Sequence, residues 1–202
     1  MRYGKDHKAE TRQQILIQAA RHFLADGIAG TAIAGLMAEA GLTHGGFYAH
    51  FPSKDELTTA AIESGLRHTR AALAREAAKW TAAGGSGLEG VIRLYLNPRH
   101  RDMPEKGCFA ALLSQEIARL PFAVRQCFTD EVAALLQLIG DLLPMPPGRK
   151  RLTQRQRLDR ATMILTGMMG SLQLARATTD ARQSKRILEL GIAAALQLAG
   201  IA

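Results

Sequence analysis

The sequence predicts an all-α protein, built almost wholly from helices. Alanine and leucine dominate its 202 residues, while aromatic residues make up only 5%. Runs rich in Val, Ile, Thr and Tyr that alternate with polar residues, which are typical of strands, are absent. Segments of helical length, with apolar residues on one face, are instead separated by glycine, proline and polar breaks.

A capped helix followed by a glycine stop is predicted from Thr31 onward. The Thr31 hydroxyl is suited to cap this helix, because it can accept from a free backbone N–H two or three residues on. Gly41 lies just past the last periodic residue and supplies the left-handed backbone that ends a helix, after which Leu42 drops back onto the apolar face. The residues of that face are Ile33, Leu36, Met37 and Ala40.

A second, shorter helix is predicted over residues 43–50. It is too short to be stable alone, so packing must hold it. The apolar side chains available for this packing are Leu42, Phe47 and Phe51. The outer face is formed by Thr43, His44, Gly45 and Tyr48. A helix, a glycine turn and a short helix with a polar outer face are the layout of a helix-turn-helix that reads DNA.

Pro52 ends the short helix, and Ser53 begins a third helix that runs to about Ala82. Ser53 and Glu56 have the spacing of a capping box, in which each side chain accepts from the other residue's backbone N–H. The later breaks predict further helices at residues 88–96, 107–120, 122–143, 153–177 and 180–199, with a polar loop over 97–104.

This arrangement resembles the DNA-binding signature of the TetR family of transcriptional regulators. The matching positions are Thr31, Ala40, Gly41, Thr43, Gly45, Phe47, Tyr48, His50, Phe51, Lys54 and Leu57. The segment from Thr11 to Gly27 also resembles the family's first helix. Leu36 and Met37 depart from the pattern, which has Ile-Ala there, so Met37 requires slightly different packing against the first helix.

The resemblance implies an N-terminal three-helix DNA-binding unit, which we place at residues 1–52. It also implies a C-terminal helical domain for ligand binding and dimerisation, at residues 53–202. The expected function is sequence-specific binding of double-stranded DNA by a homodimeric regulator. We expect a repressor that leaves a near-palindromic operator when an unknown small molecule binds or when an electrophile modifies the thiol of Cys108. An activator role stays open, because the sign depends on where the operator lies.

The resemblance and the exposed face together give a set of candidate DNA contacts. They are Thr31, Thr43, His44, Gly45, Phe47, Tyr48, His50 and Lys54. The hydroxyls of Thr43 and Tyr48 suit phosphate, although Thr43 could be only a cap and Tyr48 could serve only in packing. Gly45 has no side chain and would let a sugar-phosphate chain approach closely.

Two histidines and one lysine complete this set. His44 could read a base edge, whereas His50 could equally cap the end of its helix. Lys54 is a cation in the first turn of the next helix, where it opposes the helix dipole. A nearby phosphate would explain its presence there.

An effector pocket among the central helices has aromatic and apolar candidates. They are Trp80, Tyr95, Cys108, Phe109, Leu112, Phe122, Met163 and Met168. Aromatic and methionine side chains at helical spacing are more often plain core than ligand contacts. Glu116 is the best acidic candidate inside an apolar run, which gives no strong case for a cationic effector.

Cys108 suggests a second kind of trigger. It follows Lys106 and Gly107 at a predicted helix start, where free N–H groups and a neighbouring cation favour the reactive thiolate. The stretch 107–110 also resembles TetR regulators in which a cysteine at this helix start is common, including some that sense oxidants or electrophiles. A buried, inert cysteine is the alternative. Cys127 lies in the middle of a helix and has no such setting.

The last two predicted helices carry large apolar residues among glycines. The candidates for a dimer surface are Leu165, Met169, Leu172, Ile187, Leu190, Gly191 and Ala194. Small residues let two helices approach closely, and so much apolar surface is hard to bury within one subunit. Ordinary intrachain core is the alternative, but the resemblance favours an interface, since the TetR family typically dimerises through its two C-terminal helices.

Composition bears on location and on partners. No apolar run reaches the roughly eighteen residues that span a bilayer, and the N-terminus lacks a signal-peptide pattern, so a cytoplasmic protein is expected. The two cysteines are too few for a disulfide scaffold. A net charge of +8 suits a polyanionic partner, although the motif rather than the charge supports DNA binding.

Two other functions are alternatives to DNA-dependent regulation. An enzyme finds little support, because the six histidines form no HExxH or Cys/His metal spacing and no phosphate-binding glycine loop or GxSxG elbow occurs. Neither a metal nor a cofactor is therefore expected. The main alternative is a ligand-binding or adaptor protein with a non-functional helix-turn-helix, and the intact recognition segment argues against it.

Overall fold

The computed structural model describes residues 3–145 and 151–201, and every regular element within these ranges is a helix. The predicted all-α class is thus confirmed for the described chain. The chain divides into two compact units, one of residues 1–66 and 104–131 and the other of residues 67–103 and 132–202. The domain boundary that we placed after residue 52 stays a prediction.

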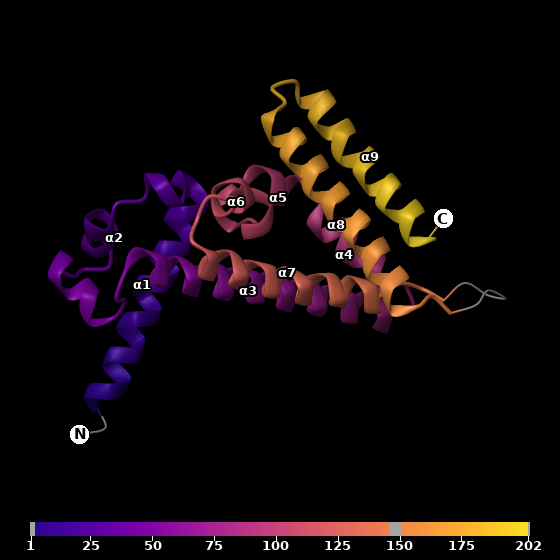
Figure 1. Cartoon of the computed structure of the whole chain (residues 1–202). Coiled ribbons are helices and arrows are strands. Elements are labelled where there is room, and N and C mark those ends of the chain that lie inside the picture. Colours follow the sequence, from indigo (N-terminus) through magenta and orange to yellow (C-terminus); the bar gives the residue numbers. More distant parts are fainter. Residues whose placement is uncertain (1–2, 146–150, 202) are drawn as a thin grey trace. The chain divides into compact units, whose positions relative to one another are not determined.

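The first unit combines the N-terminal helices with the middle of the chain (Figure 1). Its elements are α1 (Tyr3–Gly30), α2 (Ile33–Glu39), the 3-10 helix η1 (His44–Ala49), the first part of α3 (Lys54–Ala82), the 3-10 helix η2 (Pro104–Lys106), α6 (Phe109–Ile117) and the first part of α7 (Phe122–Asp141). Among its core side chains, none more than 1% exposed, are Ile15, Phe23, Leu36, Phe47, Phe51 and Leu57. This core lies beneath α2 and η1 and so supports the predicted recognition segment.

The second unit is dominated by a helical hairpin, α8 (Gln154–Ala177) and α9 (Ala181–Ala199), which lie side by side (Figure 1). It also holds α4 (Gly87–Tyr95), α5 (Pro98–Asp102) and the second parts of α3 and α7. A Cβ on Gly191 would lie only 2.5 Å from Ser171 Oγ, so the glycine permits the close approach of the two hairpin helices.

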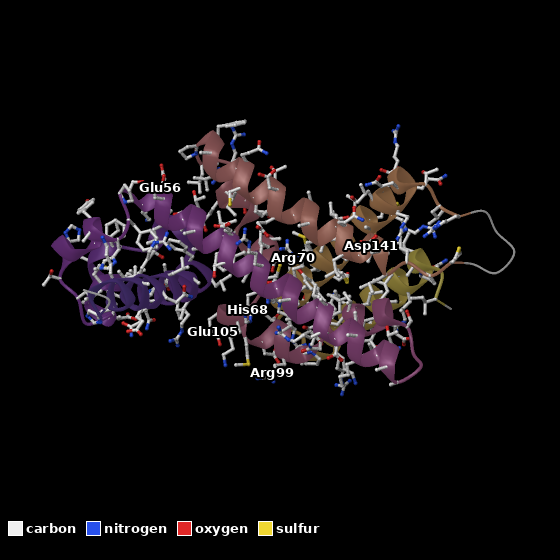
Figure 2. All side chains as sticks on the ribbon, turned by 90° about the horizontal axis from the view of Figure 1, so that it is seen from below. Glu56, His68, Arg70, Arg99, Glu105 and Asp141 are labelled. Atoms are coloured by element: carbon white, nitrogen blue, oxygen red, sulfur yellow. The ribbon has the colours of Figure 1, made fainter. Side chains whose placement is uncertain are left out.

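Local sequence explains where several of these helices begin. Thr153 and Gln156 form a complete capping box at the start of α8, and the Asp180 carboxylate accepts two N–H groups at the start of α9. The predicted box at Ser53 shows one half, in which the Ser53 hydroxyl accepts from the Glu56 N–H at 3.1 Å. The Glu56 side chain projects from the first turn of α3 (Figure 2). Figure 2 also shows Asp141, at the end of α7, whose carboxylate lies 3.1 Å from the Arg157 guanidinium of α8.

The structure corrects three local expectations. Thr31 does not cap α2, because its hydroxyl donates back to the carbonyl of Gly27 at 2.8 Å and Ala32 takes the cap position. Residues 44–49 form a 3-10 helix rather than an α-helix, since two adjacent glycines and a single turn of chain give an α-helix little support. The predicted loop at 97–104 contains α5, with Asn97 as its cap and a proline at its first turn. A capping asparagine followed by proline is a common sequence signal for the start of a helix, and it could have predicted α5.

Gly41 ends α2 as predicted, with a φ of 71°. The Gly41 N–H donates to the carbonyl of Ala38 and the Leu42 N–H to that of Met37, which is the pattern of a Schellman cap.

We predict that Gly41→Ala lowers the free energy of unfolding by about 1 kcal/mol, because a Cβ is strained in left-handed backbone. Nothing lies within 4 Å of the added Cβ, so backbone strain is the cause being tested. The matched control is Gly45→Ala, where the backbone is not left-handed and the added Cβ also meets nothing within 4 Å. Urea denaturation of both variants measures the difference, and equal stabilities would contradict the assignment.

Candidate nucleic-acid interface

Buried aromatic side chains hold the exposed segment η1. Phe47 is fully buried, and its ring stacks on that of Phe51 with centroids 6.0 Å apart and planes 25° apart. The Arg12 guanidinium of α1 lies 4.5 Å from the centre of the Phe51 ring, which adds a cation–π contact. Because Phe47 points into the core, its part in any DNA contact is to hold the segment in place.

The opposite face of η1 is open to solvent. Thr43, His44 and Gly45 are exposed, and the Tyr48 side chain is 60% exposed. The Tyr48 ring packs edge-on against His44 at 6.2 Å. Four predicted contact residues therefore lie close together in one short segment, with a phenol hydroxyl, a threonine hydroxyl and an imidazole available as hydrogen-bonding groups.

Lys54 and Thr31 are joined by a hydrogen bond that the sequence did not indicate. The Lys54 Nζ donates to the carbonyl of Thr31 at 2.7 Å, which ties the start of α3 to the corner between α1 and α2. Thr31 itself is buried, while Lys54 is half-buried. An ammonium has three donors, so this bond leaves two for a phosphate. The phosphate contact of Lys54 stays a prediction.

His50 occupies the end of η1, where its backbone N–H donates to the carbonyl of Phe47 at 2.9 Å. Its Nδ1 is buried and has no hydrogen-bond partner among the described residues. Burial lowers the pKa of His50, and the cations Lys8 and Arg12 lower it further. Both effects favour the neutral form of the imidazole over the charged form.

A histidine between two carboxylates braces α1 against α2. His22 Nε2 lies 2.9 Å from the Glu39 carboxylate, and His22 Nδ1 lies 3.2 Å from that of Asp26. The hydrogen bond with Glu39 is the main cause that raises the pKa of His22, and Asp26 adds to it against the opposing effect of burial. Sequence reasoning missed this brace, for which the four-residue spacing of His22 and Asp26 on one helix was the only signal.

The effector candidates are divided between the two units. In the first unit Cys108 and Phe109 are buried, Leu112 is half-buried and Phe122 is 71% exposed. The Phe109 ring lies against Gly65 of α3, 2.4 Å from where a Cβ would be. In the second unit Tyr95 and Met168 are buried, Trp80 is half-buried and Met163 is 55% exposed. The burial of Cys108, Phe109, Tyr95 and Met168 agrees with core packing. An effector role for any of the candidates stays a prediction.

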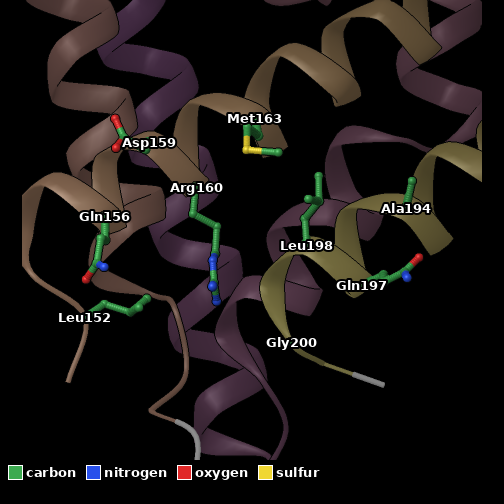
Figure 3. A pocket seen from close by; sticks show the side chains of 9 residues that line it. All are labelled: Leu152, Gln156, Asp159, Arg160, Met163, Ala194, Gln197, Leu198 and Gly200. Carbon is green, nitrogen blue, oxygen red and sulfur yellow. The ribbon is translucent and has the colours of Figure 1, made fainter. Parts of the chain in front are cut away.

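A cavity of about 860 Å³ opens between the first half of α8 and the last turns of α9 (Figure 3). Of the effector candidates, only Met163 lines it. Its apolar walls come from Leu152, Met163, Ala194 and Leu198, and its polar side chains from Gln156, Asp159, Arg160 and Gln197. The cavity belongs to the surface of the α8–α9 hairpin rather than to the interior of the helical core.

The dimer candidates are likewise divided between core and surface. Leu165, Leu172 and Gly191 are buried within the hairpin, Met169 and Ile187 are half-buried, and Leu190 and Ala194 are exposed. The exposed candidates continue on α8 through further residues spaced three or four apart, namely Met163, Gly167, Gly170 and Leu174. We call Met163, Gly167, Gly170, Leu174, Leu190 and Ala194 the hairpin strip.

Residues 15–61 match the family model described as bacterial regulatory proteins, tetR family. The match contains α2, η1 and the start of α3, the elements whose geometry is given above. The DNA-binding part of the chain thus matches the TetR family of bacterial regulators. Over 75 residues it is 41% identical to the HTH-type transcriptional regulator TtgR of Pseudomonas putida, a stretch that is 37% of this chain and 35% of TtgR. The chain thus spans about a third of that relative's length.

Solved TetR-family structures agree with the fold over nearly the whole chain. A TetR transcriptional regulator from Chloroflexus aurantiacus is 27% identical, covers 99% of this chain and 96% of its own, and gives a TM-score of 0.66. A TetR-family regulator from Agrobacterium tumefaciens is 21% identical, covers 93% and 98%, and gives a TM-score of 0.72. The reduced form of E. coli NemR is also 21% identical, covers 93% and 96%, and gives 0.69. The last two support the fold alone.

The described residues also bear on metal binding and on membrane insertion. Over residues 3–145 and 151–201, no three His, Cys, Asp or Glu side chains are grouped so that they could hold a metal ion. No helix in the same ranges is long and apolar enough to cross a membrane.

We predict that the brace at His22 makes stability depend on pH. The folded-state pKa of His22 is raised above its ordinary 6.5, so its contribution is complete below about pH 6.5 and is lost as the pH rises through the raised value. The difference in free energy of unfolding between wild type and His22→Gln should therefore be larger at about pH 6 than at about pH 8.5. Urea denaturation at each pH measures it. In a Glu39→Gln background the pH dependence should shrink, and a difference that grows with pH would contradict the brace.

Proposed function

We propose that this chain is a sequence-specific DNA-binding transcriptional regulator that reads DNA with η1. The geometry of η1 and its cap supports this proposal most directly, because Phe47 is buried while Thr43, His44 and Tyr48 are exposed to solvent. A polar face of this size, held by a buried aromatic core, suits insertion into a major groove with flanking phosphate contacts. The match of residues 15–61 to the TetR model supports this reading.

We propose further that the hairpin strip is the surface through which two copies form a dimer. Three large apolar side chains are half or more exposed there, namely Met163, Leu174 and Leu190. An added Cβ on Gly167 or Gly170 meets nothing within 4 Å, so the strip leaves room for close approach of another helix. A two-fold dimer would place two η1 segments in successive major grooves if they are about 34–36 Å apart.

The regulatory output follows from that spacing. A repressor leaves its operator when an effector binds more tightly to a conformation in which the two η1 segments have the wrong spacing. DNA affinity then falls by at most the ratio of the effector's affinities for the two conformations. We propose a small-molecule effector or modification of Cys108 as the trigger. Cys108 is the cap residue of α6 and is 1% exposed, so a reagent reaches its thiol only when the start of α6 opens.

Binding of the purified protein to DNA from its own upstream region tests the proposal. Affinity is measured across a salt series, with and without excess competitor DNA. Tight, competitor-resistant binding that weakens steeply as salt rises is the expected result. Weak binding that is equal for every sequence would favour the alternative, a ligand-binding or adaptor protein that retains a non-functional helix-turn-helix.

We predict distinct effects for the two main contact residues. Tyr48→Phe should weaken DNA binding roughly tenfold, because a hydrogen bond to a charged group contributes about 1.5 kcal/mol, and should leave the salt dependence unchanged. Lys54→Gln should lower the slope of log affinity against log salt by about 0.9, because one fewer counterion is released. Fluorescence anisotropy over a salt series measures both. An unchanged slope for Lys54→Gln would show that Lys54 serves only the Thr31 carbonyl.

We predict that Gly170→Arg prevents dimer formation without unfolding the monomer. The added side chain projects from an open position on the hairpin strip, and a charge there opposes burial against a second copy. Sedimentation velocity should show a monomer with normal helical circular dichroism. Ala133→Arg on the exposed face of α7 is the control and should remain dimeric. A dimeric Gly170→Arg protein would place the interface elsewhere.

We predict that N-ethylmaleimide weakens DNA binding through Cys108. The adduct cannot be accommodated at a side chain that is 1% exposed, so α6 must shift to hold it. Cys108→Ser should resist the reagent, whereas the half-buried Cys127, altered to Ser, should leave the response intact. If Cys108→Ser is as sensitive as wild type, thiol modification at this position is excluded as the trigger.

A further inference from the structure

α1 is interrupted close to its end. Gly27 has a φ of 79° and a ψ of 164°, outside the helical range and in the region that favours glycine. Residues 28–30 then form one last helical turn before Thr31. A turn that restarts after such an interruption has free N–H groups, as any helix start does. Gly27 has no side chain with which to cap them.

Glu116 of α6 supplies the missing cap. The Ala29 N–H donates to Glu116 Oε2 at 2.9 Å. Glu116 Oε1 lies 2.5 Å from where a Cβ on Gly27 would be, so the carboxylate rests directly on the interruption and glycine leaves room for it. A carboxylate is also the favourable charge at the start of a helical turn.

Two more hydrogen bonds extend this arrangement toward the recognition segment. The Thr31 hydroxyl donates to the carbonyl of Gly27 at 2.8 Å. The Lys54 ammonium donates to the carbonyl of Thr31 at 2.7 Å. The corner between α1 and α2 is therefore fixed from α6 on one side and from α3 on the other. η1 lies between α2 and α3 in the chain, so both of its flanks start from this corner.

We infer that Glu116 is a positioning residue for DNA binding, one that caps the last turn of α1 and so fixes the corner from which α2 and η1 are presented. The inference rests on the proposed function. Glu116 lies in α6, outside the segment from α2 to the start of α3 that would contact DNA. Glu116 acts through its hydrogen bond with the Ala29 N–H. Through this bond α6, which is not part of the helix-turn-helix, sets the fraction of molecules in which η1 has its DNA-binding geometry. Apparent affinity falls in proportion to that competent fraction.

The test compares Glu116→Ala with Glu116→Gln and with Gln115→Ala. Glutamine retains an acceptor for the Ala29 N–H, whereas alanine removes it, and Gln115 is an exposed neighbour on the same helix. Each variant is measured for affinity to upstream DNA under competitor and for amide exchange at Ala29 by NMR. Exchange at amides of α8 reports whether the rest of the chain is unaffected.

Glu116→Ala should bind DNA about fivefold to tenfold more weakly and exchange the Ala29 amide faster, with exchange in α8 unchanged. Glu116→Gln should restore most of the affinity and of the Ala29 protection, and Gln115→Ala should match wild type. Wild-type affinity in Glu116→Ala, or failure of glutamine to restore binding, overturns the inference alone. Absence of competitor-resistant binding in the wild-type protein overturns the proposed function, and the positioning role with it.

Discussion

The burial of Phe47 is the constraint on which the N-terminal unit depends. η1 spans residues 44–49 and includes two glycines, so its own backbone preferences contribute little to its conformation. A fully buried phenylalanine contributes roughly 1.5–3 kcal/mol. The conformational entropy lost when this short segment is ordered opposes that gain, so the burial of Phe47 holds η1 only if neighbouring side chains are also fixed. Phe51 and Met37 provide those neighbours, and both are 1% exposed or less.

Polar contacts around this aromatic core then fix the direction of the segment. His22 links α1 to α2, Lys54 links the start of α3 to Thr31, and Glu116 links α6 to the end of α1. Each is a directional bond placed at a corner, where apolar packing alone leaves the angle free. A recognition face that is already ordered loses less conformational entropy when it binds DNA, and this favours both affinity and selectivity.

The sequence predicted those features that depend on neighbours in the chain. The glycine stop at Gly41, the apolar faces and most helix ranges follow from periodicity and caps, and the structure confirms them. The long-range contacts were beyond prediction. Thr31 had the sequence of a cap, yet its hydroxyl donates back to the carbonyl of Gly27 and Ala32 takes the cap position of α2. Glu116 and Ala29 are far apart in the chain, and no local pattern pairs them.

The sequence predicted one part of the candidate sites, the exposed face of η1, better than the effector and dimer surfaces. The exposed face of η1 could be inferred because the polar residues Thr43, His44 and Tyr48 share one short segment with the apolar Phe47. The effector and dimer candidates lie on helices with apolar residues on more than one face, and only the packing of α8 on α9 decides which face remains open. Leu172 and Leu190 had equal standing in the sequence, yet the first is buried and the second is half exposed.

Selection of bound sequences from a random DNA library tests the central claim most directly, because it requires no knowledge of the operator. The purified protein is mixed with the library, bound DNA is recovered over several rounds, and the recovered pool is sequenced. We expect enrichment of a near-palindrome with half-sites about one helical turn apart. The double variant Tyr48→Phe with Lys54→Gln loses phosphate contacts, so it should recover the same motif but bind it more weakly. A recovered pool with no shared motif, at salt concentrations where the protein still binds, would contradict the central claim.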